Sequence, residues 1–211
     1  MKNDLNGWPP KRQKMVILDF DGTLVQMRIT YLAMTSIFMM SGRPMPSYME
    51  FARDFHPPYK LFYEARGVFM PKEEIRAWYD MFKSHQISSF FPDVRQELKR
   101  LSEEAIVCIL SANKESLVRS RCEIHGLARN ISQFIGDSLD KTDPMKKLCR
   151  AYGVDLDQAT YLGDFADDMV RARLAGVNAV GITRGRPTRQ VLLDAGAHIV
   201  IDQLSELKVG I

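Results

Sequence analysis

The sequence predicts an α/β fold in which a parallel sheet carries helices on both faces, with a small all-helical segment inserted after the first strand. From residue 105 onward, short apolar runs alternate with amphipathic segments, as in a chain of βαβ units. Between residues 27 and 90 the apolar residues follow a helical spacing instead, and nothing there alternates like a strand. Glycines also stand where the later helices should end, since the residue after a helix often takes a left-handed conformation. These glycines are Gly126, Gly153, Gly176 and Gly196.

The chain begins with a segment that has no apolar core. Residues 1–14 contain basic side chains and a Trp-Pro-Pro turn, so we expect a loose tail and not a secretory signal. The apolar run at residues 15–18 then predicts a buried strand, because it is bounded by that tail and by a turn.

Residues 27–90, which we call the cap, predict several short helices. Prolines divide the segment, and its most apolar stretch, residues 29–40, contains Tyr, Thr and Ser and is too short to cross a bilayer. A hydrophobic core is the expected place for the apolar side chains Met39, Met40, Phe55, Tyr59 and Phe62, although they could instead form a dimer surface or a wall of the substrate site. A solvated face is the expected place for the basic side chains, although they could instead bind a second anionic group. These are Arg43, Arg53, His56, Lys60 and Arg66.

The chain returns to the sheet near residue 91, so residues 15–26 and 91–211 should form one Rossmann-like core. Pro92 suits the first position of a helix over residues 93–101, because a helix needs no N–H donor there. The further expected strands are residues 105–110, 134–135, 160–162, 178–182 and 198–201. The further expected helices are residues 114–125, 143–152, 167–175 and 188–195.

Composition excludes several classes of protein. The net charge is +3, but basic and acidic residues are interspersed, so a nucleic-acid-binding stripe is not indicated. The three cysteines are odd in number and lack CxxC spacing, which favours neither a disulfide framework nor a zinc site. A reducing, cytoplasmic setting fits best, with no membrane partner. The oligomeric state stays open between a monomer and a homodimer.

The first expected strand ends in two acids, Asp19 and Asp21. Alternate strand residues share a face, so the two carboxylates should point the same way. Like charges that close require a cation or a shared proton. The pattern therefore suggests a metal site at the carboxyl edge of the sheet, where open α/β folds bind ligands. The plainer alternative is a strand followed by an acidic turn.

Three more polar sites fall at the ends of later strands. Ser111 follows residues 105–110, Lys141 follows the short strand near residue 135, and Asp164 follows residues 160–162, with Asp167 and Asp168 close behind. Singly, Ser111 could cap a helix, Lys141 could be a solvated lysine, and the last two acids could favour a helix N-terminus. Jointly they supply what phosphoryl transfer through an aspartate requires.

With these residues in this order, the sequence resembles the haloacid dehalogenase superfamily. Asp19-Phe-Asp-Gly-Thr23 is similar to the first motif of that family, Ser111 to the second, Lys141 to the third, and Gly163-Asp-x-x-x-Asp168 to the fourth. The resemblance runs from about residue 15 to 207. With its helical cap between the first and second motifs, the chain resembles the phosphoglycolate phosphatase-like branch.

The resemblance implies a role for each motif residue. Asp19 would be the nucleophile that forms an aspartyl-phosphate, and Asp21 would be the acid that protonates the leaving oxygen and then activates water. Mg²⁺ would lie on Asp19, Asp164 and the backbone carbonyl of Asp21. The side chains expected to hold the phosphoryl oxygens are Thr23, Ser111 and Lys141. Asp168 would orient Lys141 or a metal-bound water. Asp167 has no assigned role, because the family often has Asn there.

The implied function is a Mg²⁺-dependent phosphatase that hydrolyses a small soluble phosphomonoester, either phosphoglycolate-like or a sugar phosphate. A phosphomutase of the same superfamily is the nearest alternative, and a phospho-accepting signalling or binding domain is the second. Asp21 argues against a dehalogenase, which has no leaving oxygen to protonate. Two departures from the family leave the substrate open: Gln26-Met27-Arg28 follows the first motif, and Ala112 separates Ser111 from Asn113.

Overall fold

The computed structural model describes residues 13–55, 59–84, 89–186 and 188–210, so nearly all of the expected tail lies outside the described residues. Within these ranges, six strands form one parallel sheet in the order β3-β2-β1-β4-β5-β6. The strands are β1 (Met15–Leu18), β2 (Ile106–Leu110), β3 (Gln133–Ile135), β4 (Ala159–Gly163), β5 (Asn178–Ile182) and β6 (Ile199–Ile201). The predicted α/β class with a parallel sheet is confirmed.

The strand β1 can occupy the buried centre of the sheet because its four residues are all apolar. Met15 is paired with Ile106 of β2 on one side and Ala159 of β4 on the other, and all four residues of β1 are buried. A strand covered on both faces reads as a continuous apolar run, because neither set of alternating side chains meets water.

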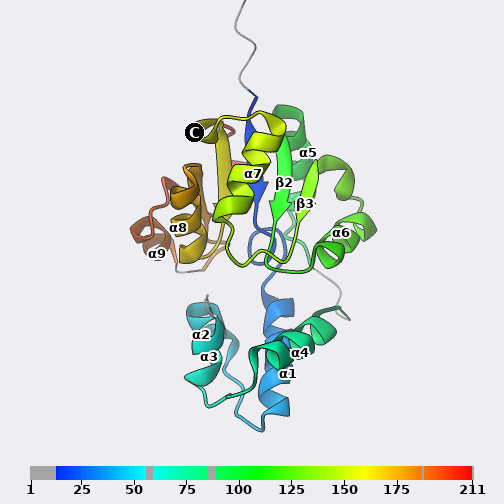
Figure 1. Ribbon diagram of the computed structural model, residues 1–211, viewed down its shortest axis with the longest axis vertical. Coiled ribbons are helices and arrows are strands. Elements are labelled where there is room, and N and C mark those ends of the chain that lie inside the picture. The colour runs from blue at the N-terminus through cyan, green and yellow to red at the C-terminus, as the bar shows by residue number, and fades with distance from the viewer. Residues whose placement is uncertain (1–12, 56–58, 85–88, 187, 211) are drawn as a thin grey trace, which may run out of the picture.

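Helices cover both faces of this sheet (Figure 1). On one face, α5 (Val94–Glu104) and α6 (Glu115–Ile124) pack against the even-numbered side chains of β1. On the other face, α7 (Thr142–Tyr152), α8 (Ala166–Ala175) and α9 (Arg189–Asp194) pack with the odd-numbered ones. Short 3-10 helices cover Ala128–Asn130, Leu156–Gln158 and Leu204–Glu206.

The predicted ends of these helices are largely confirmed. The glycines at positions 126, 153, 176 and 196 all have positive φ, between 63° and 102°. The prediction for Pro92 was wrong, because α5 begins at Val94 with Asp93 as its N-cap residue. The Asp93 carboxylate accepts hydrogen bonds from Arg184, at 2.7 and 2.9 Å, and from the backbone of Leu204, so tertiary partners fix this turn.

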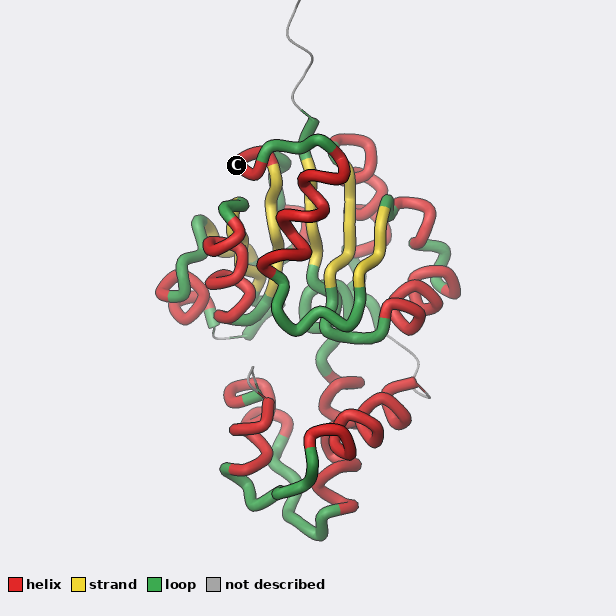
Figure 2. The backbone as a smooth tube through the Cα atoms, in the orientation of Figure 1, coloured by secondary structure: helices red, strands yellow, loops and turns green. Residues whose placement is uncertain are grey.

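Four cap helices lie beyond the carboxyl edge of the sheet: α1 (Arg28–Met40), α2 (Tyr48–Asp54), α3 (Tyr59–Glu64) and α4 (Lys72–Ser84), as Figure 2 shows. They share an apolar cluster of their own, which includes Phe38, Phe51, Phe55 and Phe62. No helix of the described chain is both long enough and apolar enough to cross a membrane.

The expectations for individual cap side chains had mixed outcomes. Phe55 and Phe62 are buried as expected, and Tyr59 is half-buried. The core expectation was wrong for Met39 and Met40, which are 71% and 54% exposed, because they lie on the side of α1 away from the residues that face the cluster. Of the basic residues, Arg43 and Lys60 are exposed, Arg66 pairs with Asp54 at 2.6 Å, and His56 and the Arg53 side chain lie outside the described parts.

Two neighbouring chain crossings join the cap to the sheet. The N–H of Gln26 donates to the carbonyl of Ser89 at 2.8 Å, and the N–H of Phe91 donates to the carbonyl of Leu24 at 2.9 Å. The outgoing and returning segments therefore run side by side, at the edge where the polar strand ends gather.

Candidate active site

The site lies at the carboxyl edge of β1, where the connections to its two neighbours run in opposite directions. In open α/β sheets this reversal leaves a crevice between the strand ends. A cavity of about 40 Å³ occupies it. Its lining residues are Asp19, Asp21, Tyr59, Ser111, Ala112, Leu139, Lys141, Phe165, Asp167 and Asp168. The strand ends that the sequence singled out thus meet in one place, together with Tyr59 from the cap.

The turn after β1 depends on a glycine. Gly22 has φ +77°, and its N–H donates to the carbonyl of Val25 at 2.8 Å. A Cβ at this position would collide with the carboxylate of Asp164. Only glycine combines this backbone conformation with so close an approach, so the turn brings the first motif against the fourth.

Lys141 connects two carboxylates of the site. Its Nζ donates to Asp19 Oδ1 at 2.7 Å, to Asp168 Oδ1 at 2.8 Å and to the Tyr161 hydroxyl at 2.7 Å. Burial alone would lower the pKa of Lys141, but the adjacent Asp168 and Asp19 raise it well above its usual value. Burial raises the pKa of Asp19 to about 8, and Lys141 opposes that rise. A permanent cation therefore lies beside the carboxylate that the sequence marks as the nucleophile.

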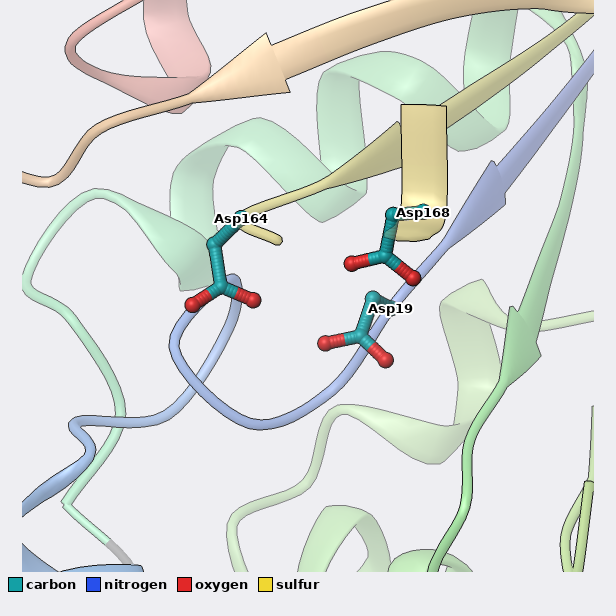
Figure 3. Close-up of side chains that lie close together, drawn as sticks. All are labelled: Asp19, Asp164 and Asp168. Atoms are coloured by element: carbon teal, nitrogen blue, oxygen red, sulfur yellow. The ribbon is translucent and has the colours of Figure 1, made fainter. Parts of the chain in front are cut away.

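Asp19, Asp164 and Asp168 form a compact cluster of carboxylates (Figure 3). One oxygen from each lies within 4.8 Å of the others. Asp164 is buried, its Oδ1 has no hydrogen-bond partner among the described residues, and its Oδ2 contacts the Arg186 guanidinium. Burial raises the pKa of Asp164 to about 6, although Arg186 opposes the shift. Three hard oxygen donors, one of them unpartnered, fit a magnesium ion.

The side chain of Asp21 lies outside this cluster. Its Oδ2 accepts a hydrogen bond from Asn113 Nδ2 at 2.7 Å and contacts the ammonium of Lys83, while its Oδ1 has no partner in the described chain. Burial tends to raise the pKa of Asp21, but Lys83 and Asn113 outweigh it and hold the pKa below its usual value. The two acids of the first motif therefore have different partners, Asp19 a core lysine and Asp21 a cap lysine.

Of the remaining motif residues, Ser111 and Asp167 line the same cavity, and Thr23 follows Gly22 in the turn after β1. The buried Thr23 hydroxyl has no partner within the described residues, and the Thr23 carbonyl accepts two hydrogen bonds from Arg184. The Ser111 hydroxyl accepts hydrogen bonds from the backbone N–H and the side-chain amide of Asn113, both at 3.1 Å. Asp167 pairs with Arg171 at 3.2 Å.

Comparison with known proteins agrees with this geometry. Residues 16–182 match the family model described as haloacid dehalogenase-like hydrolase. The phosphoglycolate phosphatase of Pseudomonas fluorescens is 25% identical over 96% of this chain and 81% of its own length. That of Aliivibrio fischeri is 29% identical, but over 58% of this chain and only 57% of its own length.

Solved structures share the fold along most of the chain. A haloacid dehalogenase-like family hydrolase from Streptococcus pneumoniae superposes with a TM-score of 0.78 at 22% identity, over 92% of this chain and 96% of its own. A β-phosphoglucomutase candidate from Thermotoga maritima gives a TM-score of 0.66 at 17% identity, over 90% and 94%.

The chain therefore belongs to the haloacid dehalogenase-like hydrolases, because the family model covers well over half of it. Several relatives that match it are named phosphoglycolate phosphatases, so within that family the chain falls in the phosphoglycolate phosphatase-like branch.

Lys83, Tyr161 and Arg186 are residues of the site that the sequence analysis did not single out, whereas Tyr59 lines the cavity, in agreement with the alternative of a substrate wall. Tyr161 lies within the apolar run of β4, where its hydroxyl gives no pattern of its own. Lys83 is in an amphipathic helix, and the sequence does not reveal which face of that helix meets the sheet. A weak signal existed only for Asn113, whose displaced position after Ser111 is a departure from the family pattern.

Proposed function

We propose that this protein is a Mg²⁺-dependent phosphatase that hydrolyses a small phosphomonoester through an aspartyl-phosphate on Asp19. The observation that carries the proposal is the position of Lys141, which donates to Asp19 and Asp168 from the edge of the carboxylate cluster. In this proposal residues 15–26 and 91–211 form the catalytic core, and residues 27–90 form the cap.

In the first step a carboxylate oxygen of Asp19 attacks phosphorus, and the bond from phosphorus to the leaving oxygen breaks. Asp21 gives a proton to that oxygen, since the anionic phosphoryl group beside it would raise the Asp21 pKa, which Lys83 and Asn113 hold low in the structure described. In the second step water attacks the same phosphorus and the bond to Asp19 breaks, while the Asp21 carboxylate takes a proton from the water. Asp19 and Asp21 have different partners, Lys141 for Asp19 and Asn113 for Asp21, so each acid can act separately.

Charge on the phosphoryl oxygens is balanced by groups that are already in place. Lys141 supplies a buried positive charge, and the unpartnered hydroxyl of Thr23 and the hydroxyl of Ser111 supply hydrogen bonds. Donors fixed before reaction are worth more than donors that must reorient. Asp168 fixes the position of the Lys141 ammonium by accepting a hydrogen bond from it on Oδ1. The Tyr161 hydroxyl donates to the same Oδ1 atom at 3.0 Å.

Asp19 and Asp164 would hold the magnesium ion, with Asp168 within reach of it, and the backbone carbonyl of Asp21 remains the third ligand that the family resemblance implies. Bound there, the ion would stabilise the negative charge that develops on the phosphoryl group. The unpartnered Asp164 Oδ1 supports this assignment.

The names of the relatives favour phosphoglycolate or a similarly small substrate. A phosphomutase is the second candidate, because the fold also matches the Thermotoga maritima β-phosphoglucomutase candidate. A sugar phosphate bound in a mutase could take the phosphoryl group back before water attacks the intermediate.

The test is a panel of phosphorylated metabolites that contains 2-phosphoglycolate and hexose phosphates, assayed with Mg²⁺. Release of inorganic phosphate in proportion to substrate loss supports the phosphatase. Conversion of one sugar phosphate isomer to another without release of phosphate establishes the mutase instead. Lys141→Met, which removes the buried cation without adding a charge, should abolish turnover, and the matched control Lys146→Met should not.

A further inference from the structure

Lys83 is a cap residue that ends inside the catalytic site. It belongs to α4, and its side chain is fully buried. The Nζ atom contacts Asp21 and lies 2.9 Å from Asn113 Oδ1, both in the core. From the cap, the Tyr79 hydroxyl at 2.8 Å and the Thr30 hydroxyl at 3.2 Å complete its surroundings.

A buried ammonium is an unfavourable means of joining two parts of a protein, because its burial costs free energy. Removing a charge from water costs several kcal/mol, and an apolar side chain of similar size often stabilises a protein as well or better. Lys83 therefore contributes something that an apolar contact would not. Its one charged partner among the described residues is Asp21, the acid–base group in the mechanism proposed above.

Lys83 does not reach the substrate space itself. The residues that line the cavity include Asp21 but not Lys83, so the carboxylate lies between the ammonium and the cavity. With Asn113, Lys83 contacts Asp21 Oδ2, and the other carboxylate oxygen has no partner among the described residues. This arrangement fixes the carboxylate from behind and leaves one oxygen available.

The rest of α4 is docked on the same loop. Arg76 donates to the carbonyl of Ala112 and to Asp137, both at 3.3 Å, and Asp80 pairs with Lys114 at 3.1 Å. Arg76, Asp80 and Lys83 are spaced at i, i+4 and i+7 and share one face of the helix. That polar face meets the loop that carries Ser111 and Asn113, so Lys83 can reach Asp21 only while α4 is docked there.

We propose that Lys83 is the positioning residue of Asp21, so that the acid–base group is completed by the cap and only when the cap is closed. This inference rests on the proposed phosphatase function. It makes the cap part of the machinery for proton transfer, in addition to any part it has in selecting the substrate.

The leaving group distinguishes this role from a structural one. An alkyl leaving oxygen needs the proton from Asp21, whereas p-nitrophenolate leaves readily without it. The acid role is isolated by kcat/KM, which reports the steps up to transfer of the phosphoryl group to Asp19, because hydrolysis of the aspartyl-phosphate is the same step for both substrates. Lys83→Met should lower kcat/KM for an alkyl phosphate by about 10- to 10³-fold, a part of the roughly 10²- to 10⁴-fold that acid–base assistance is worth. For p-nitrophenyl phosphate the loss in kcat/KM should stay within a few-fold. Lys83→Arg should recover part of the alkyl phosphate activity.

Three further variants make the result unambiguous. Lys60→Met removes an exposed cap lysine that pairs with Glu64 and should behave like the wild type. In an Asp21→Asn background, Lys83→Met should cause no additional loss, because the group that it positions is already disabled. If Lys83→Met does not fold, Tyr79→Phe, which deletes only the hydroxyl next to Nζ, should give the same leaving-group dependence with a smaller amplitude.

An equal loss of kcat/KM for both leaving groups would overturn the inference and reduce Lys83 to a structural contact. A rise in KM confined to substrates with a second anionic group would also overturn it, because Lys83 would then bind substrate. In both cases the wild type remains a phosphatase, so the proposed function survives. A wild type that hydrolyses no phosphomonoester would overturn the proposed function and this inference together.

Discussion

The stability of the metal-free protein should depend on pH through Asp164, which is buried in the carboxylate cluster. Burial raises its pKa from 3.8 to about 6 in the folded protein, although Arg186 opposes the shift. The folded state therefore binds a proton more tightly than the unfolded state. Such a group favours folding fully below its unfolded pKa, and that contribution is lost as the pH rises through the folded pKa.

The size of this effect follows from the shift itself. One pKa unit corresponds to about 1.4 kcal/mol, so a rise of about two units removes about 3 kcal/mol from the free energy of unfolding at high pH. About 2 kcal/mol of that should be lost between about pH 4.5 and pH 8, because part of the titration lies below this window. Asp164→Asn keeps the shape of the side chain but cannot ionise, so it escapes this loss.

Urea unfolding in EDTA at both pH values measures the difference. The free energy of unfolding of Asp164→Asn should rise relative to the wild type by about 2 kcal/mol on going from about pH 4.5 to pH 8. At pH 8, Mg²⁺ at about 100 times its Kd should stabilise the wild type by about 3 kcal/mol and leave Asp164→Asn unchanged. Asp143→Asn, at an exposed position on α7, controls for general charge effects. Parallel pH profiles for wild type and Asp164→Asn, or an equal response to Mg²⁺, would refute the reasoning.

Two other predictions concern the cap and the loop beside Ser111. Replacing residues 27–90 with a short Gly/Ser linker should leave a folded core that still binds Mg²⁺ in calorimetry. The order of its activities on different phosphoesters should differ from that of the full chain, and an unchanged order would locate specificity in the core. Gly136→Ala should cost roughly 1–3 kcal/mol of stability and also lower kcat, because the new Cβ would collide with the Glu115 backbone. Gly153→Ala, with open space around it, should cost only about 1 kcal/mol and leave kcat unchanged; equal kcat values would contradict the prediction.

The position of the site could be predicted from one topological rule for parallel sheets. Once the strands are parallel, their carboxyl ends share an edge, so Asp19, Ser111, Lys141 and Asp164 had to come together. Their apolar strands could be recognised directly, since a strand buried on both faces leaves an uninterrupted apolar run.

Other features depend on packing between segments that have no common sequence pattern. Helical spacing gives α4 a polar face but does not reveal that this face lies on the loop after β2, so Lys83 could not be assigned to Asp21. For the same reason the sequence analysis assigned Asp168 only a supporting role, whereas in the structure its carboxylate lies with those of Asp19 and Asp164. The Asp21 side chain faces the cap, and the metal position expected of the Asp21 backbone carbonyl stays a prediction.

The central claim is that a covalent phosphate forms on Asp19, and rapid acid quench during turnover tests it most directly. The wild-type protein, mixed with Mg²⁺ and an activated phosphoester and then digested, should yield one phosphorylated peptide, with the phosphate mapped to Asp19 by mass spectrometry. Asp19→Asn should yield none, and Asp21→Asn should still yield it, because only acid–base assistance has been removed. A phosphate mapped to any other residue, or steady turnover by Asp19→Asn, would contradict the account.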